Sequence, residues 1–121
     1  MNQAAKLPFM TGGASEMALT VRTQFGAGRS SGAQHSQSLE ALLAHIPGLT
    51  VVMPSTPADT YGLLRSAIQD PNPVVFIENK TLYFSSGEVA EPPAPVPIGE
   101  AVTLRAGSDA TVVALSRLAH D

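Results

Sequence analysis

A glycine-rich stretch that ends in a histidine is the part of the chain best suited to chemistry. Residues 26–37 read Gly-Ala-Gly-Arg-Ser-Ser-Gly-Ala-Gln-His-Ser-Gln, and apolar residues then recur at helical spacing, at Leu39, Leu42, Leu43 and Ile46. This pattern predicts a flexible loop that leads into a helix over residues 36–46, with His35 at its start. The positive end of the helix dipole disfavours a second positive charge there. A histidine in that field would stay neutral near neutral pH and would be able to donate or accept a proton.

The composition limits the class of protein. The chain has 121 residues, enough for one modest domain, and only 14% of them are charged. A net charge of −3 with seven scattered basic residues disfavours a nucleic-acid partner, and no apolar run reaches the length of a membrane span. The absence of cysteine excludes disulfides and thiolate chemistry. The first six residues lack a signal pattern, so we expect a cytoplasmic protein.

A βαβ unit is predicted after the glycine-rich loop. Residues 49–53 and 74–77 are mostly apolar, which is typical of strands buried on both faces. Between them, Thr56 followed by Pro57 and Asp59 indicates the start of a helix over residues 57–69. The buried side of this helix is expected to consist of Leu63, Leu64, Ala67 and Ile68. The predicted fold class is therefore α/β, an open parallel sheet with helices on both faces.

Five further segments complete the predicted organisation. Residues 2–7 predict a short helix that stops before Pro8, and residues 17–23 predict a strand with Leu19 and Val21 on one face. Four prolines within residues 85–99 indicate an extended connector. Two more strands are predicted, over about residues 100–105 and 111–115, the second of the buried type. The low charge content suggests surface that a partner or further sequence covers.

Ligands of open parallel sheets lie beyond the carboxyl ends of the strands, where residues 23–35, 54–56 and 78–84 are expected to gather. His35 lies in the first of these loops, and Glu78 and Tyr83 lie in the third. For His35, the alternative to chemistry is that it only packs against or caps the helix. For Glu78, the alternative to a catalytic carboxylate is a solvated or partner-contacting residue at a strand end.

Several short motifs connect the chain to a known family. They are Gly12-Gly13, Gly32-Ala-Gln-His-Ser-Gln37, Ser38-Leu-Glu-Ala, His45-Ile-Pro-Gly-Leu, Val51-Val-Met-Pro, Gly62-Leu-Leu and Asn72-Pro-Val-Val. With these motifs the chain resembles, over almost its whole length, the beta subunit of thiamine-diphosphate-dependent 2-oxoacid dehydrogenases of the pyruvate, branched-chain and acetoin complexes. The resemblance implies a partial transketolase-like pyrimidine-binding domain over residues 1–84, a proline-rich connector and strand over 85–108, and the start of a C-terminal transketolase-like domain over 109–121.

The resemblance implies oxidative decarboxylation of a 2-oxoacid with acyl transfer to lipoyl. The implied partners are the alpha subunit of a heterotetramer, the lipoyl-bearing acyltransferase core and the 2-oxoacid substrate. The alpha subunit shares the thiamine diphosphate and holds its magnesium. In this chain, His35 matches an active-site residue of the family near the thiazolium and the substrate. No residue is assigned to cofactor binding, because the glutamate that activates the cofactor lies upstream of the matched region.

The resemblance also implies a structural potassium site. Its ligands fall on the backbone carbonyls of Leu19, Ala67 and Ile68 and on Asp70 and Asn72. A helix C-terminus with unpaired carbonyls suits such a cation, and the carboxylate of Asp70 adds a formal negative charge. The alternative is an ordinary turn in which Asp70 and Asn72 cap backbone groups.

Two other functions remain open. One is a noncatalytic, truncated fragment, and the other is another transketolase-like enzyme with a different acceptor. The Gln-His-Ser-Gln motif and the Asp70-Pro-Asn-Pro turn favour the dehydrogenase. We expect this chain to be inactive by itself, because it lacks the glutamate that activates the cofactor.

Overall fold

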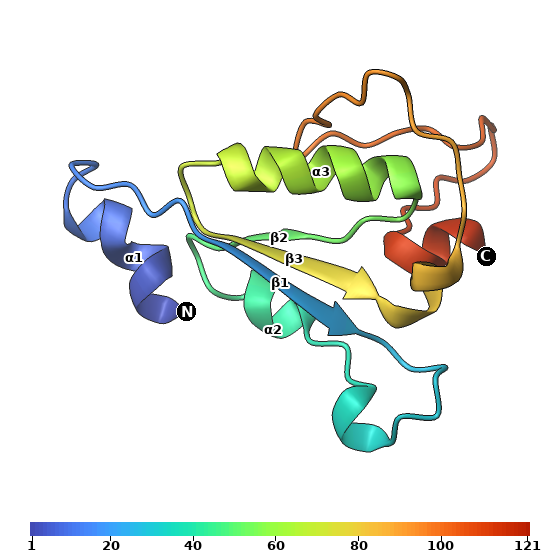
Figure 1. The fold of residues 1–121 in the computed structure, drawn as a ribbon, viewed down its shortest axis with the longest axis horizontal. Helices are drawn as coiled ribbons and strands as arrows, with labels where there is room; N and C mark the ends of the chain where they lie inside the picture. Colours follow the sequence, from blue (N-terminus) through green and yellow to red (C-terminus); the bar gives the residue numbers. More distant parts are fainter.

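The computed structural model describes all 121 residues and confirms the α/β class. Three parallel strands form an open sheet in the order β1-β3-β2. Helix α3 covers one face of this sheet and α2 covers the other (Figure 1). The elements in chain order are α1 (Asn2–Met10), β1 (Thr20–Phe25), the 3₁₀ helix η1 (Ala33–His35), α2 (Glu40–Ala44), β2 (Thr50–Val52), α3 (Pro57–Gln69), β3 (Val74–Asn79) and the 3₁₀ helices η2 (Lys80–Phe84) and η3 (Ser116–His120).

The βαβ unit is confirmed, and α3 has the predicted bounds. The helix begins with the expected capping box: Asp59 donates its N–H to the Thr56 hydroxyl over 3.0 Å, and its carboxylate accepts the Thr56 N–H over 3.1 Å. Two backbone N–H groups at the start of the helix, which have no acceptor within the helix, thereby form hydrogen bonds. One expectation about its buried side is wrong, because Ile68 is 63% exposed. The side of the helix that packs on the core carries Leu63, Leu64 and Ala67.

The core lies on both faces of the central strand β3. Val74 and Phe76 pack with Val52 and Ala67 beneath α3, and Val75 and Ile77 pack with Phe25 on the opposite face. This alternation follows from the two-residue period of a strand. Burial on both faces explains why the sequence of β3 is continuously apolar, and the core holds the carboxyl end of the sheet in place.

Two elements differ from their predicted bounds. Strand β1 lies about two to three residues later than predicted, because Thr20 to Phe25 pair in register with Val74 to Asn79 of β3. Helix α1 continues through Pro8 instead of stopping before it. Proline removes a single N–H from a helix, and the last turn keeps its other bonds, including Thr11 N–H to the Leu7 carbonyl at 3.1 Å.

The two strands predicted over residues 100–105 and 111–115 are absent, and these segments are irregular and exposed. Val112, for example, is 86% exposed. A strand needs a neighbour to pair its backbone groups, and neither segment has one in this structure. The connector before them contains no helix or strand and packs along α3, where the Ser66 hydroxyl donates to the Val96 carbonyl over 2.6 Å. None of the helices combines the length and the apolarity needed to cross a lipid bilayer.

Candidate functional site

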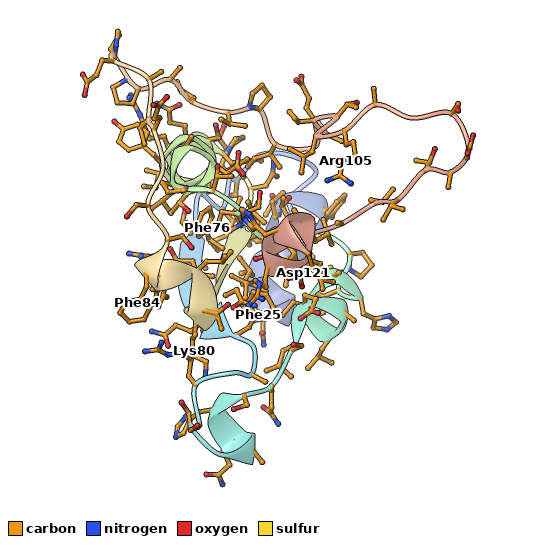
Figure 2. All side chains as sticks on the ribbon, turned by 90° about the vertical axis from the view of Figure 1, so that its right-hand side faces the viewer. Phe25, Phe76, Lys80, Phe84, Arg105 and Asp121 are labelled. Atoms are coloured by element: carbon orange, nitrogen blue, oxygen red, sulfur yellow. The ribbon has the colours of Figure 1, made fainter.

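Two of the three loops expected at the carboxyl edge of the sheet, residues 23–35 and 78–84, contact each other. Lys80, the first residue of η2, donates its ammonium group to the His35 carbonyl, and the Arg29 guanidinium lies 4.3 Å from the centre of the Phe84 ring. These two contacts fix the glycine-rich loop against η2, and Figure 2 shows Lys80 and Phe84 on this segment, above η1. The loop after β2 lies beneath η3, because the Ser116 hydroxyl donates to the Pro54 carbonyl over 2.9 Å.

His35 lies at this edge, but it does not begin a helix. It is the last residue of η1, it is exposed, and α2 begins only at Glu40. The Gln37 carbonyl accepts the Gly26 N–H over 3.0 Å, a contact that holds this segment against the end of β1. The Ser36 hydroxyl also bonds back to the Gly32 carbonyl over 2.6 Å, a local bond that competes with helix formation. The dipole argument for His35 is therefore wrong.

Two open hollows adjoin the end of β1, and Arg22 lines both of them. The first, the Tyr83 hollow, has a volume of about 520 Å³ and is lined by Arg22, Thr23, Gln24, Glu78 and Tyr83. The second, the His35 hollow, has a volume of about 440 Å³ and is lined by Arg22, Thr23, Gln24, Gln34, His35, Gln37, Leu39 and Lys80. His35 therefore faces an open, mainly polar hollow that is suited to a small polar ligand.

Glu78 is neither solvated nor free. Only 4% of the residue is exposed, and its Oε2 accepts both the Arg22 Nε–H and the Tyr83 hydroxyl, each over 2.9 Å. The bond to Glu78 raises the pKa of Arg22 above its already high value, and their opposite charges add to the rise. Burial raises the pKa of Tyr83, and the carboxylate of Glu78 adds to this effect. The structure thus contradicts the expectation of a solvated strand-end residue.

The residues expected to bind potassium are close together in the fold. The Ala67 carbonyl accepts the Thr20 hydroxyl over 2.9 Å, and the Leu19 carbonyl accepts the Val74 N–H over 2.9 Å, so both lie where β1 meets the end of α3. Oδ1 of Asp70 accepts the backbone N–H of Asn72 over 2.8 Å. This last bond closes a capping turn, which is the alternative to a potassium site at these residues. A carbonyl oxygen has two lone pairs, so these bonds leave acceptor capacity for a cation.

Arg22 and Lys80 were missed by the sequence analysis. The role of Arg22 depends on the pairing of β1 with β3. This pairing brings Arg22 to Glu78, although 56 positions separate the two residues in the sequence. The only signal in the sequence was a charged residue inside an apolar-patterned strand. Without the strand order, it did not identify a partner.

The chain is thus an α/β domain, and its polar hollow lies at the carboxyl edge of an open parallel sheet, where ligands of such sheets usually bind. Residues 1–85 match the transketolase pyrimidine-binding domain, and the chain belongs to this family.

The relatives of the chain are beta subunits of oxidoreductases and dehydrogenases. It is 50% identical over 119 residues to subunit beta of the acetoin:2,6-dichlorophenolindophenol oxidoreductase of Cupriavidus necator, with 98% of this chain and 35% of that protein covered. It is 44% identical over 116 residues to the pyruvate dehydrogenase E1 component subunit beta of Rickettsia felis, with 96% and 36% covered. For the mitochondrial 2-oxoisovalerate dehydrogenase subunit beta 2 of Arabidopsis thaliana, the identity is 45% over 115 residues, with 93% and 32% covered. The family resemblance is confirmed, and the chain spans about a third of the length of these relatives.

Proposed function

We propose that this chain forms one side of the active site of a thiamine-diphosphate-dependent 2-oxoacid dehydrogenase, as part of its beta subunit. The observation that carries the proposal is the 44–50% identity to such beta subunits over nearly the whole chain. The fold supports it, because the Gln-His-Ser-Gln motif lies at the carboxyl edge of a parallel sheet. The proposed reaction is oxidative decarboxylation of a 2-oxoacid with acyl transfer to lipoyl.

The residues of this chain do not by themselves fit thiamine diphosphate. The only carboxylate that lines the two hollows is Glu78, and it is occupied by Arg22 and Tyr83. No three histidine or acidic side chains gather in a way that would hold the magnesium of the diphosphate. The proposal therefore assigns the cofactor contacts and the magnesium to an alpha subunit and to beta-subunit residues outside this sequence.

His35 is the residue of this chain that we propose to act on the substrate. Its exposed imidazole faces a hollow of about 440 Å³, and its backbone is held by Lys80. In this position it would orient the substrate carboxylate or the lipoyl group, or carry a proton. Two contacts to η2 hold the loop that carries His35.

The proposal has four further parts. Leu19, Ala67, Ile68, Asp70 and Asn72 bind a structural potassium ion. The partners are an alpha subunit, in a heterotetramer, and a lipoyl-bearing acyltransferase core. Residues 1–84, 85–108 and 109–121 are the partial pyrimidine-binding domain, the connector and the start of a second domain. The protein is cytoplasmic, as expected from the sequence.

The test of the role of His35 is a kinetic comparison in the assembled two-subunit enzyme. We expect His35→Ala to lower turnover by roughly 10²–10⁴-fold, the usual range for general acid–base roles. An exposed loop residue contributes little packing, so the melting temperature should change little. The control is His45→Ala, because His45 is also exposed and follows α2 directly. Equal kinetics for the two variants would contradict the assignment.

A second test concerns the chain by itself. We expect no saturable binding of thiamine diphosphate with magnesium in isothermal titration, and no decarboxylation of pyruvate above the buffer rate. Binding in the micromolar range would show that the site in this chain is more complete than we propose.

A further inference from the structure

The His35 hollow is lined by cations and amides and by no carboxylate. Arg22 and Lys80 supply the positive charge, and Gln24, Gln34 and Gln37 supply amide groups. Arginine and lysine side chains are donors only, and each glutamine amide has two N–H donors. No acid in the lining competes for these donors. A small anion is therefore the class of ligand that this hollow favours.

Arg22 is anchored by one nitrogen, and the rest of its guanidinium is free. Its Nε donates to Oε2 of Glu78, whereas its two terminal nitrogens form no hydrogen bond, and its side chain is 58% exposed. The anchoring carboxylate is buried and is also held by Tyr83. The direction of the guanidinium is thus restrained while its terminal edge stays open to a ligand. Such preorganisation favours binding through two parallel hydrogen bonds.

Lys80 also lines this hollow. Its ammonium group donates one hydrogen bond to the His35 carbonyl, and an ammonium has three donors. Two donors therefore remain for a ligand next to His35.

We propose that Arg22 and Lys80 bind the carboxylate of a small organic acid beside His35, with Glu78 as the positioning residue for Arg22. The fork of a guanidinium matches the planar pair of oxygens in a carboxylate. Phosphate sites are often built on glycine-rich backbone, and no glycine lines this hollow. The carboxylate site stands independently of the proposed function. Only the identification of the acid as a 2-oxoacid rests on the proposed function.

The test compares two small ligands of similar size, pyruvate and acetoin, of which only pyruvate has a carboxylate. Binding of each is measured by isothermal titration to the assembled protein that contains this chain. We expect R22Q to weaken pyruvate binding by about tenfold or more, the usual effect of losing a hydrogen bond to a charged group. Acetoin binding should not change. The control is R65Q, because Arg65 is an exposed arginine on α3, away from both hollows.

Two further variants keep the test decisive if R22Q does not fold. R22K retains the positive charge beside buried Glu78 but lacks the paired terminal N–H donors of the guanidinium. We therefore expect it to weaken pyruvate binding less than R22Q does, and again to leave acetoin binding unchanged. E78Q releases Arg22 and should also weaken pyruvate and not acetoin. Equal weakening of both ligands in these variants would indicate a structural role only and would overturn the proposal.

The remaining outcomes separate this proposal from the proposed function. Absence of saturable pyruvate binding, or inorganic phosphate that competes as well as pyruvate does, would overturn the carboxylate site. An unchanged KM for a 2-oxoacid in R22Q would overturn the site and leave the dehydrogenase function standing. Arg22-dependent binding of pyruvate without any decarboxylation in the assembled protein would support the site and refute the function.

Discussion

The hydroxyl of Tyr83 donates a 2.9 Å hydrogen bond to Oε2 of Glu78, a carboxylate near the end of the central strand β3. The same oxygen accepts the Nε–H of Arg22 from the neighbouring strand. One buried acceptor thus connects β1, β3 and η2. The two partners compensate the cost of burying a charged group at the edge of the site.

The Tyr83 phenol should ionise above the pH at which free tyrosine does. Burial raises the pKa of Tyr83, and the negative carboxylate of Glu78 raises it further. In the variant Tyr61→Phe, Tyr83 is the only tyrosine, and its tyrosinate absorbance should titrate above about pH 10. Adding Glu78→Gln should lower the midpoint. A midpoint equal to that of free tyrosine would contradict this prediction.

The same pKa shift determines a pH dependence of stability. The folded chain retains a proton that the unfolded chain releases, so the contribution of Tyr83 is fully present below about pH 10 and is lost as the pH rises through the folded-state pKa. The free energy of unfolding should therefore fall more steeply above that pH with Tyr83 than with Tyr83→Phe. Urea unfolding at several alkaline pH values measures the difference.

The capping box of α3 should contribute measurably to stability. Thr56→Ala removes the acceptor for the Asp59 N–H and should lower the free energy of unfolding by about 1 kcal/mol. Thr103→Ala, in an exposed irregular segment, is the control and should have little effect. Urea unfolding followed by circular dichroism compares the two. Equal effects would show that the cap is dispensable.

Gly48 should be required for the packing of α1. Its φ is +94°, and a Cβ there would overlap the Ala5 carbonyl oxygen of α1. Gly99 has the same φ, and a Cβ at that position would meet no atom within 4 Å, so Gly99→Ala is a matched control for backbone strain. Gly48→Ala should increase amide hydrogen exchange in residues 2–10, whereas Gly99→Ala should not. Unchanged exchange in the first variant would mean that α1 does not depend on this close approach.

The proposed potassium site predicts a cation-dependent stability. A cation that binds only the folded state raises the melting temperature by mass action. Replacing potassium by a large organic cation should lower the melting temperature of the assembled protein, and Asp70→Asn should reduce that dependence. The control is Asp109→Asn, because Asp109 lies in an exposed irregular segment. If the melting temperature does not respond to the cation, the turn at Asp70 is only the capping turn seen in the structure.

Local patterns in the sequence determined the elements whose stabilising groups are close in the chain. The capping residues Thr56 and Asp59 fixed the start of α3, and the apolar run of β3 predicted a strand buried on both faces. The short motifs between Gly12 and Val75, taken together, also identified the family, which the family match and the relatives confirm. For α3 and β3, the decisive residues lie within a few positions of one another.

Tertiary structure decided the features that depend on distant partners. The bond from the Gly26 N–H to the Gln37 carbonyl holds residues 36 and 37 against the end of β1, and the helix begins only at Glu40. Residues 100–115 form no strand because no neighbour pairs with them. The pairing of β1 with β3 brings Arg22 to Glu78, and Arg22 lines both hollows. Backbone and side-chain partners that are distant in sequence compete with local preferences, so they become evident only when the chain is folded.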